Sequence, residues 1–464
     1  MCGVFGIAGH EDAVTLTCQA LQGLQHRGQE STGLAVFQDG LINVKVGMGL
    51  VADIFKPKAI MEFSGDTAIG HVRYSTAGSS SLINAQPIKA QTSKGRIAIA
   101  HNGNLVNAKQ LRQQLVGGGA IFAGNSDTEV IMHLIARSKK KKIEDAILDA
   151  LSRVEGAYTL TILLPGRVMG VRDPNGFRPL FLGKKDGAYC FASEVASFRL
   201  IGAETIREVE PGEVIIAEGE NLHIIPWKTG QRVTFCIFEH VYFSRPDSVY
   251  SGHPVAATRR KFGHRLAEEQ PAEADIVVPV PDSGVFAALG YAERANIPLE
   301  FGLIRAHHIG RTFIEPDQKT RRVGVYRKLA PVEHLLRGKR VVLIDDSIVR
   351  GTTMNQIVNM IRDAGAREVH VRISCPPIRF SCFYGIDTPK SEELIAHAAT
   401  VEEICHFIEA DSLGYLSLDG MLEAIGGENT YCTACWDGAY PVGFEGEKQA
   451  TLFEHEMKDK EIKA

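Results

Sequence analysis

The spacing of apolar and polar positions changes along the chain. From Val4 to about Pro226, short runs rich in β-branched and aromatic residues follow one another closely, with turn residues between many of them. Runs spaced this closely are best joined by hairpins, which predicts antiparallel sheet. The runs that we expect to form strands are Val4–Ala8, Gly33–Phe37, Ile42–Val46, Ala68–Val72, Arg96–Ala100, Tyr158–Leu164, Val168–Val171, Pro179–Leu182, Ala188–Ala192 and Glu213–Ala217.

Helical patterns are interspersed with these runs. We expect helices over Leu105–Leu115 and Glu129–Arg137, and Ser126-Asp127-Thr128 before the second is a plausible cap. The first part of the chain is therefore predicted to consist of helices packed on antiparallel sheets.

The second part alternates strand and helix patterns, which is typical of βαβ units and a parallel sheet. The expected strands are Ile276–Val280, Leu299–Ile304, Arg340–Ile344 and Glu368–Ile373, and the expected helices are Ala257–Glu269, Gly284–Ala295 and Met354–Arg362. The change of rhythm falls between Pro226 and Ser251. We therefore predict two domains, residues 2–231 and 232–464.

Composition narrows the class of protein. The 464 residues include 51 Lys+Arg and 55 Asp+Glu, so no basic excess points to nucleic acid or to an anionic membrane. No apolar run approaches the roughly 18 residues of a spanning helix, and the first residues lack a secretory signal, so we expect a cytoplasmic protein. Nine scattered cysteines in such a chain suggest thiols, metal ligands or a nucleophile rather than disulfides.

Cys2 is the first candidate nucleophile. If Met1 is removed, Cys2 carries its thiol and a free α-amino group on one residue, and an amine with a pKa near 8 can act as a local base. A lone cysteine at this position would mean little by itself. The segments that change its meaning are Cys2-Gly3-Val4-Phe5-Gly6-Ile7, His26-Arg27-Gly28-Gln29-Glu30-Ser31, Gly70-His71-Val72-Arg73-Tyr74-Ser75-Thr76, His101-Asn102-Gly103-Asn104 and Ser126-Asp127-Thr128-Glu129.

Together and in this order, these segments resemble the class II, N-terminal-nucleophile glutamine amidotransferases. The resemblance implies that Cys2 attacks the carboxamide of glutamine, with Asn102 and the Gly103 N–H as oxyanion hole. It also implies that Arg73 and Asp127 hold the α-carboxylate and α-amino groups of glutamine. Taken singly, Asp127 could be a helix cap and Arg73 a surface ion pair. We interpret His71 and His101 as structural, because the terminal amine supplies a base.

A second candidate site follows a buried strand. Val341–Ile344 leads into two acids, Asp345 and Asp346, and then a loop rich in Gly, Ser and Thr opens a helix. Loop N–H groups at a helix N-terminus suit a phosphate, and carboxylates at a strand end suit ribose hydroxyls and magnesium. The candidate binding residues are Asp345, Asp346, Ser347, Ile348, Val349, Arg350, Gly351, Thr352 and Thr353.

This string resembles the 5-phosphoribosyl-1-pyrophosphate (PRPP) loop of phosphoribosyltransferases. By that resemblance, Pro279–Gly284 is the pyrophosphate-side loop, Ser283 is a magnesium ligand together with Asp345 and Asp346, and Arg311 and Lys328 belong to a mobile loop that supplies cations to the pyrophosphate. The segment Arg305-Ala306-His307-His308-Ile309 departs from the pattern of the family. The resemblance therefore does not define how His307 and His308 affect closure of the loop or a path for ammonia.

Four cysteines form a third candidate site. Cys432 and Cys435 are a C-x-x-C pair that could serve redox chemistry or zinc, and four thiolates suit zinc or a [4Fe–4S] cluster. The contexts of Cys236 and Cys382 resemble the iron–sulfur branch of the PRPP amidotransferases, which favours the cluster over zinc. Cys18, Cys190, Cys375 and Cys405 are interpreted as ordinary buried thiols.

Both sites on one chain resemble the family of glutamine PRPP amidotransferases. The implied fold is an αββα sandwich of antiparallel sheets followed by a phosphoribosyltransferase α/β domain with a mainly parallel sheet. The implied reaction releases ammonia from glutamine at Cys2 and joins it to C1 of PRPP, which gives 5-phosphoribosylamine, glutamate and pyrophosphate, the committed step of purine biosynthesis. The resemblance also implies Mg²⁺, purine nucleotides as feedback inhibitors, and a homotetramer. The alternatives are another class II amidotransferase, such as glucosamine-phosphate synthase or asparagine synthetase, and a regulator that senses PRPP.

Overall fold

The computed structural model describes residues 1–75, 78–229, 232–306, 329–427 and 430–443. These residues form two compact units. The first unit takes residues 1–235, then 382–387 and the described residues from 440 onward, whereas the second takes the described parts of 236–381 and 388–439. The later chain thus contributes two segments to the first unit. A division of the chain at residue 231 assigns these two segments to the second domain instead, and that division stays a prediction.

The first unit contains a seven-stranded sheet in which every neighbouring pair is antiparallel. Its order is β11-β9-β10-β1-β4-β2-β3, so the first strand of the chain lies in the interior of the sheet. The bounds are β1 (Gly3–Ala8), β2 (Ser31–Gln38), β3 (Leu41–Met48), β4 (Thr67–Arg73), β9 (Phe181–Lys185), β10 (Ala188–Ala192) and β11 (Glu204–Glu208).

The same unit holds a six-stranded antiparallel sheet in the order β13-β12-β8-β7-β6-β5. The bounds are β5 (Ile88–Thr92), β6 (Gly95–Leu105), β7 (Gly156–Leu164), β8 (Arg167–Arg172), β12 (Glu213–Glu218) and β13 (Asn221–Pro226).

Side chains that alternate along the strands build two kinds of core. On β1, Val4 and Ala8 belong to the cluster shared by the two sheets, whereas Phe5 and Ile7 belong to the cluster under helices. Successive side chains of a strand point to opposite faces, so a strand that is buried on both faces reads as a continuous apolar run. The six residues of β1 are all buried.

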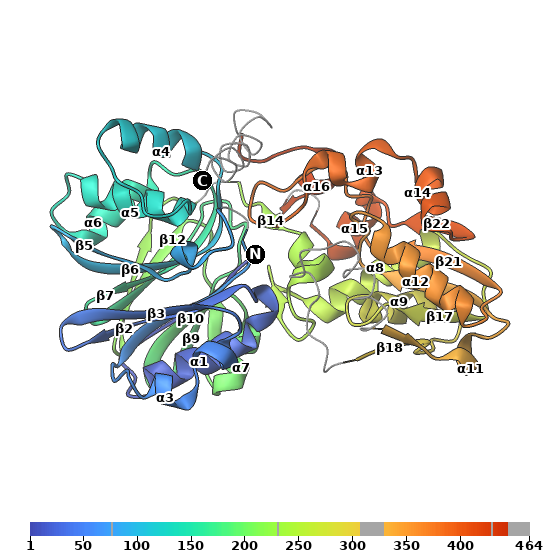
Figure 1. Ribbon diagram of the computed structural model, residues 1–464, viewed down its shortest axis with the longest axis horizontal. Helices are drawn as coiled ribbons and strands as arrows, with labels where there is room; N and C mark the ends of the chain where they lie inside the picture. The colour runs from blue at the N-terminus through green and yellow to red at the C-terminus, as the bar shows by residue number, and fades with distance from the viewer. Residues whose placement is uncertain (76–77, 230–231, 307–328, 428–429, 444–464) are drawn as a thin grey trace, which may run out of the picture. The chain divides into compact units, whose positions relative to one another are not determined.

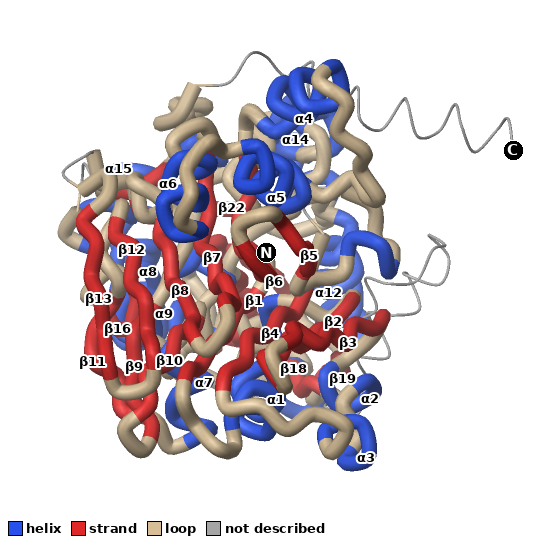
Figure 2. The backbone as a smooth tube through the Cα atoms, turned by 90° about the vertical axis from the view of Figure 1, so that its left-hand side faces the viewer, coloured by secondary structure: helices blue, strands red, loops and turns tan. Residues whose placement is uncertain are grey.

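Helices cover the outer face of each sheet and complete an αββα sandwich (Figure 1). Helices α1 and α7, with the short α2 and α3, pack on the seven-stranded sheet, and α4, α5 and α6 pack on the six-stranded sheet. Figure 2 shows α1 on one side of the strands and α5 and α6 on the other. The bounds are α1 (Ala13–Gly23), α2 (Val51–Ile54), α3 (Pro57–Ile60), α4 (Ala108–Gly117), α5 (Asp127–Arg137), α6 (Ile143–Leu151) and α7 (Val195–Ile201).

The second unit is built on a four-stranded sheet, β17-β20-β21-β22, in which every neighbouring pair is parallel. Its strands are β17 (Ile276–Pro279), β20 (Arg340–Asp345), β21 (Glu368–Ile373) and β22 (Ser412–Tyr415). The helices of the unit are α8 (Val255–Glu269), α9 (Val285–Ala295), α11 (Glu333–Leu336), α12 (Thr352–Asp363), α13 (Ile395–Ala398), α14 (Val401–Phe407), α15 (Leu418–Ile425) and α16 (Ala434–Asp437).

Short elements complete the fold. They are the pairs β14 (Phe235–Cys236) with β23 (Tyr431–Cys432), β15 (Val249–Tyr250) with β16 (His253–Pro254) and β18 (Leu303–Arg305) with β19 (Leu329–Pro331), the 3₁₀ turns η1 (Gln25–Arg27), η2 (Leu82–Asn84) and η5 (Ser391–Glu393), and the π-helical η3 (Glu239–Phe243). In the described part of the chain, no helix is both long and apolar enough to cross a membrane.

The predicted fold class is confirmed: the first unit has antiparallel sheets and the second a parallel sheet. One predicted helix began too early. Leu105–Leu115 was expected to be helical, but β6 continues to Leu105, opposite Gly156 on β7, and α4 begins at Ala108. Ladder pairing with a neighbour that is distant in sequence decides this boundary, and a local pattern does not contain that information. Similarly, the expected strand Leu299–Ile304 is reduced to a bridge at Leu299 and the start of β18.

We predict that Gly263→Ala destabilises the second unit. A Cβ at position 263 of α8 would lie 1.9 Å from the Ala287 carbonyl oxygen on α9, so the two helices would have to separate. Overpacking of this kind costs about 1–3 kcal/mol. The measurement is the free energy of unfolding in urea. Gly117→Ala on α4 is the matched control, because a Cβ there meets open space and Ala favours a helix by about 0.5–1 kcal/mol. Equal stability of the two variants would contradict this reading of the α8–α9 contact.

We also predict that His71 makes the first unit sensitive to acid. Burial of His71 on β4 lowers its pKa from 6.5 to about 3. Between pH 6.5 and about 3, the unfolded chain therefore binds a proton at His71 and the folded chain does not. The free energy of unfolding is consequently unaffected by His71 above pH 6.5 and decreases as the pH falls from 6.5 toward 3. The slope is about 1.4 kcal/mol per pH unit for one such group.

Urea unfolding of wild type and of His71→Asn, measured at several pH values in that window, tests this prediction. The variant is expected to lose stability less steeply on acidification. His223→Asn, on an exposed position of β13, serves as the control and should follow the wild-type slope. An unchanged slope in His71→Asn would show that other groups cause the acid sensitivity.

Candidate functional site

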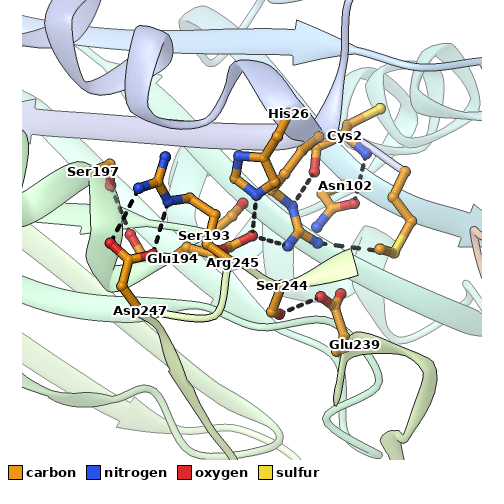
Figure 3. A network of polar contacts seen from close by, with 12 residues as sticks. Cys2, His26, Asn102, Ser193, Glu194, Ser197, Glu239, Ser244, Arg245 and Asp247 are labelled. Carbon is orange, nitrogen blue, oxygen red and sulfur yellow. Dashed lines mark hydrogen bonds and ion pairs between the residues drawn. The ribbon is translucent and has the colours of Figure 1, made fainter. Parts of the chain in front are cut away.

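Cys2 immediately precedes the first residue of the interior strand β1. Gly3 pairs with Val72 of β4, so Cys2 lies beside Arg73 and Tyr74. The backbone N–H of Cys2 donates to Asn102 Oδ1 at 3.1 Å (Figure 3). The Cys2 thiol lies 3.5 Å from the Tyr74 carbonyl oxygen. The structure thus brings the predicted nucleophile directly against one predicted oxyanion-hole residue.

Burial controls the ionisation of the groups at the chain start. It raises the pKa of the Cys2 thiol, against the opposing effect of the neighbouring amino terminus. It also lowers the pKa of the Met1 amino group to about 6, because the charged ammonium is removed from water. The Met1 amine is therefore mostly neutral at pH 7 and can accept a proton. In this structure the amine belongs to Met1, one residue before the thiol.

Asn102 and Gly103 lie side by side on β6. Asn102 is fully buried, and its Nδ2 has no hydrogen-bond partner among the described residues. Gly103 has φ +148°, and a Cβ there would lie 2.0 Å from the Ala157 carbonyl oxygen, so only glycine fits. An amide N–H₂ that is buried without a partner beside a thiol can stabilise an oxyanion that forms at that thiol.

Asp127 is brought to this segment by contacts with β6. Its Oδ2 accepts the Leu105 N–H at 3.0 Å, and its Oδ1 lies 3.5 Å from His101 Nδ1. Burial opposes ionisation of Asp127, but the charge of His101 and the hydrogen bonds from His101, Leu105 and Thr128 outweigh it, so the pKa of Asp127 is lowered. Asp127 is therefore an anion at neutral pH. The first residue of α5 is also capped independently, since Ser126 Oγ accepts the Thr128 N–H.

Arg73 ends β4 and is buried. Its Nη1 donates to the Ser79 carbonyl oxygen at 3.1 Å, and the next residue, Tyr74, contacts the Cys2 thiol. The first unit thus holds a buried cation, Arg73, next to the residue that contacts the Cys2 thiol. It also holds a buried anion, Asp127, against the strand β6 that carries Asn102. Such a pair suits the α-carboxylate and α-amino groups of a free amino acid.

Sequence reasoning missed three residues at this site. Arg27 Nε donates to the Cys2 carbonyl oxygen at 3.0 Å. Arg27 also forms an ion pair with Glu194, which is the second residue after β10. Glu30 accepts the Ser75 N–H at 3.1 Å and also its hydroxyl. Arg27 and Glu30 stand inside a recognised motif, but nothing in the sequence around Glu194 distinguishes it from other glutamates.

The second predicted site lies at the carboxyl end of β20. Asp345 ends the strand and Asp346 follows it, both buried, and Ser283 Oγ donates to Asp345 Oδ1 at 3.3 Å. Burial, and then the neighbouring charge of Asp346, raise the pKa of Asp345 well above its ordinary value. The structure therefore places Ser283 against Asp345, and Asp346 follows Asp345 in the chain, so the three predicted magnesium ligands lie near one another. A divalent cation would offset the cost of two adjacent buried carboxylates.

The predicted phosphate loop leads directly into α12. Ser347 Oγ donates to Asp346 Oδ2 at 2.6 Å, and the Val349 carbonyl oxygen accepts the Ile395 N–H at 2.9 Å. Gly351 has φ +76° and precedes the first residue of α12, Thr352. Because α12 has no side-chain cap, its first N–H groups and the Thr352 and Thr353 hydroxyls are available to an anion.

Part of the prediction lies outside the described residues. Arg311 and Lys328 fall in 307–328, as do His307 and His308 of the departing segment. Arg305 is described: its guanidinium pairs with Asp282 of the pyrophosphate-side loop.

The four predicted cluster ligands lie on β14, on β23, in α16 and in the segment 382–387. Cys236 ends β14, Cys432 ends β23, and these two strands pair. Cys435 lies in α16, and its carbonyl oxygen accepts the N–H groups of Arg379 and Phe380, a short distance along the chain from Cys382. Within the described ranges, no group of three or more His, Cys, Asp or Glu side chains is arranged to hold a metal ion.

Two family models match the chain. A glutamine amidotransferase domain matches residues 71–199, and a phosphoribosyl transferase domain matches residues 247–409. The first match falls in the first unit, and the second falls in the second unit apart from residues 382–387, which belong to the first.

Curated relatives match nearly the whole chain. A chloroplastic amidophosphoribosyltransferase of Vigna aconitifolia is 51% identical over 95% of this chain and 91% of its own length. The amidophosphoribosyltransferases of Bacillus subtilis and Archaeoglobus fulgidus are 47% and 48% identical, over 95% and 97% of this chain and 94% and 99% of theirs.

A solved structure also matches. Glutamine PRPP amidotransferase from B. subtilis, complexed with ADP and GMP, superposes with a TM-score of 0.90 and 46% identity over 96% of this chain and 98% of that chain. From these full-length matches, and from the matches to a glutamine amidotransferase domain and a phosphoribosyl transferase domain on one polypeptide, it follows that the chain belongs to the amidophosphoribosyltransferases, the glutamine-dependent enzymes of purine biosynthesis.

Proposed function

We propose that Cys2 is the nucleophile of the glutaminase half-reaction. Its sulfur attacks the carboxamide carbon of glutamine, and the oxyanion is stabilised by Asn102 Nδ2 and by the Gly103 N–H. Collapse of this intermediate releases ammonia and leaves a glutamyl thioester, which water then hydrolyses to glutamate. The α-amino group of Cys2, exposed by removal of Met1, takes the thiol proton and returns it to the leaving ammonia.

The observation that carries this assignment is the hydrogen bond from the Cys2 N–H to Asn102 Oδ1, 3.1 Å long and buried. It holds the thiol residue against an amide whose Nδ2 is left for a ligand. Arg73 would then bind the α-carboxylate of glutamine and Asp127 its α-amino group. Asp127 is suited to this because its pKa is lowered and it stays charged.

In the second unit, we infer that residues 347–353 bind the 5′-phosphate of PRPP and that Asp345 and Asp346 bind the ribose. Ammonia from the first site attacks C1, and pyrophosphate leaves with its charge balanced by Arg311 and Lys328. Asp345, Asp346 and Ser283 would hold Mg²⁺, which supplies charge neutralisation to the leaving pyrophosphate. The buried, adjacent carboxylates fit a cation because they are costly without one.

We further propose that Cys236, Cys382, Cys432 and Cys435 bind a [4Fe–4S] cluster, with zinc as the alternative. The donor set supports it: four thiolates are the usual ligands of such a cluster. The pairing of β14 with β23 supports it too, since Cys236 and Cys432 end adjacent strands and Cys435 follows at C-x-x-C spacing. The cluster would be structural, linking segments that are distant in sequence.

Regulation and assembly of this chain are proposed from its relatives. The B. subtilis structure is a complex with ADP and GMP, and we propose purine nucleotides as feedback inhibitors of this chain as well. A homotetramer and a cytoplasmic location stay predictions, and the plant relatives are named as chloroplastic.

We predict that Cys2→Ala abolishes glutamine-dependent formation of phosphoribosylamine and leaves the ammonia-dependent reaction intact, because only the first site loses its nucleophile. The measurement is pyrophosphate release from PRPP with glutamine or with ammonium as nitrogen source. The rate with glutamine is expected to fall by at least about 10³-fold, and the rate with ammonium to stay within about twofold of wild type.

Asp345→Asn with Asp346→Asn is the complementary variant, which is expected to lose both reactions. Loss of both activities in a folded Cys2→Ala protein would contradict the division into two sites. Pyrophosphate release by the Asp345→Asn, Asp346→Asn protein would contradict the PRPP assignment.

We also predict that anaerobically purified protein contains about four iron and four sulfide per chain. Cys382→Ser should lose them, whereas Cys405→Ser, a cysteine outside the proposed set, should keep them. The measurement is metal and sulfide analysis with visible absorption, independent of activity. A colourless protein with one zinc per chain would favour the zinc alternative, and retention of iron by Cys382→Ser would contradict the ligand set.

A further inference from the structure

The backbone of Cys2 donates one hydrogen bond through its N–H and accepts another through its carbonyl oxygen. Asn102 Oδ1 accepts the Cys2 N–H, and Arg27 Nε donates to the Cys2 carbonyl oxygen at 3.0 Å. Removal of Met1 converts the first donor from an amide into an amine, whereas the carbonyl group is unchanged by that removal. The Arg27 contact therefore acts on a group of Cys2 that processing leaves chemically unchanged. Processing does remove one neighbour of Arg27, the Met1 sulfur, which lies 3.8 Å from Arg27 Nη2.

Arg27 depends on a carboxylate. Its side chain is completely buried, and Glu194, itself 1% exposed, pairs with Arg27 Nη1 through Oε1. The same oxygen lies 2.7 Å from His26 Nε2. Figure 3 marks this contact by a dashed line. A buried cation without an anion is costly, so Glu194 sets where the guanidinium can lie.

Glu194 is held in place by β1 itself. The residue before it, Ser193, donates its N–H to the Val4 carbonyl oxygen at 3.0 Å, and Ser193 Oγ accepts the Val4 N–H at 2.9 Å. On the other side, Ser197 Oγ in α7 donates to the Glu194 carbonyl oxygen at 2.7 Å. The backbone around Glu194 is thus bonded, through Ser193, to the strand that directly follows Cys2.

We propose that Glu194 is a positioning residue, which acts through Arg27 to hold the carbonyl group of Cys2, and with it the thiol, in place for attack on glutamine. The inference rests on the proposed role of Cys2 and names the residues that orient it. Attack requires the sulfur within about 3–3.5 Å of the carboxamide carbon, and a displacement of about 1 Å costs on the order of 10²-fold in rate. Glutamine itself is bound by other groups, Arg73 and Asp127, so its binding is not expected to change.

The test is Glu194→Gln in the full chain, which keeps the shape of the side chain and removes its charge. We expect kcat for glutamine hydrolysis to fall about 10- to 100-fold, with KM for glutamine within about threefold. The ammonia-dependent reaction with PRPP should be unchanged. Glu194→Asp, which keeps the charge, should recover part of kcat. Glu144→Gln, which removes a carboxylate paired with Arg167 elsewhere in the first unit, is the matched control and should behave as wild type.

A second variant separates positioning from a general loss of structure. Arg27→Lys keeps the cation beside Glu194 but lacks the guanidinium Nε that reaches the Cys2 carbonyl, so it should show the same loss of kcat. It also covers the case in which Glu194→Gln does not fold. Alkylation of Cys2 by iodoacetamide should stay near the wild-type rate in both variants, whereas a collapsed site would expose the thiol and speed alkylation.

Two outcomes overturn the proposal: kcat within about twofold of wild type in folded Glu194→Gln or Arg27→Lys, or a loss that falls on KM alone. Failure of the proposed function is distinguishable from these. If wild type hydrolyses no glutamine, or if Cys2→Ala still does, the role of Cys2 is wrong; if wild type is active and Glu194→Gln is equally active, only the positioning role is wrong.

Discussion

The site in the first unit depends on the two-sided pairing of the first strand. β1 is hydrogen-bonded to β10 on one side and to β4 on the other, and every one of its residues is buried. A chain end normally frays, because nothing opposes its conformational entropy. Here Cys2 directly precedes a strand that is paired on both sides, and its backbone N–H and carbonyl oxygen are hydrogen-bonded to Asn102 and Arg27. A nucleophile at the second position can therefore be placed accurately.

The same burial sets the electrostatics of the site. Cys2 and the amino terminus lie out of water, which raises the pKa of the thiol and lowers that of the amine. Both groups are thus favoured in their neutral forms, thiol and free amine, from which proton transfer can begin. The buried Arg27 also lowers the pKa of the amine, and Glu194 offsets the cost of that buried cation. The pair of Arg27 and Glu194 therefore contributes both to the hydrogen bond on the Cys2 carbonyl oxygen and to the charge around the amine, for which burial is the larger cause.

A feature could be predicted from the sequence where the residues that form it are close together along the chain. Asp345 to Thr353 is a continuous strand, loop and helix start, so its local structure could be predicted from adjacent residues, and the proposed PRPP contacts rest on the same residues. In contrast, Cys2 and Asn102 are 100 residues apart and meet only through sheet pairing. Their association was predicted from a family resemblance, because no local pattern encodes it.

The failures have the same physical origin. The expected helix start at Leu105 was wrong because β6 gains ladder partners from β7, which a local pattern cannot reveal. Glu194 was not predicted at all: its meaning comes from Arg27, which is distant in sequence, and from the register of β1 with β10. In a site assembled by long-range pairing, residues that touch the substrate tend to stand in recognisable motifs. Residues that hold those groups in place are chosen by geometry alone, and a structure is needed to find them.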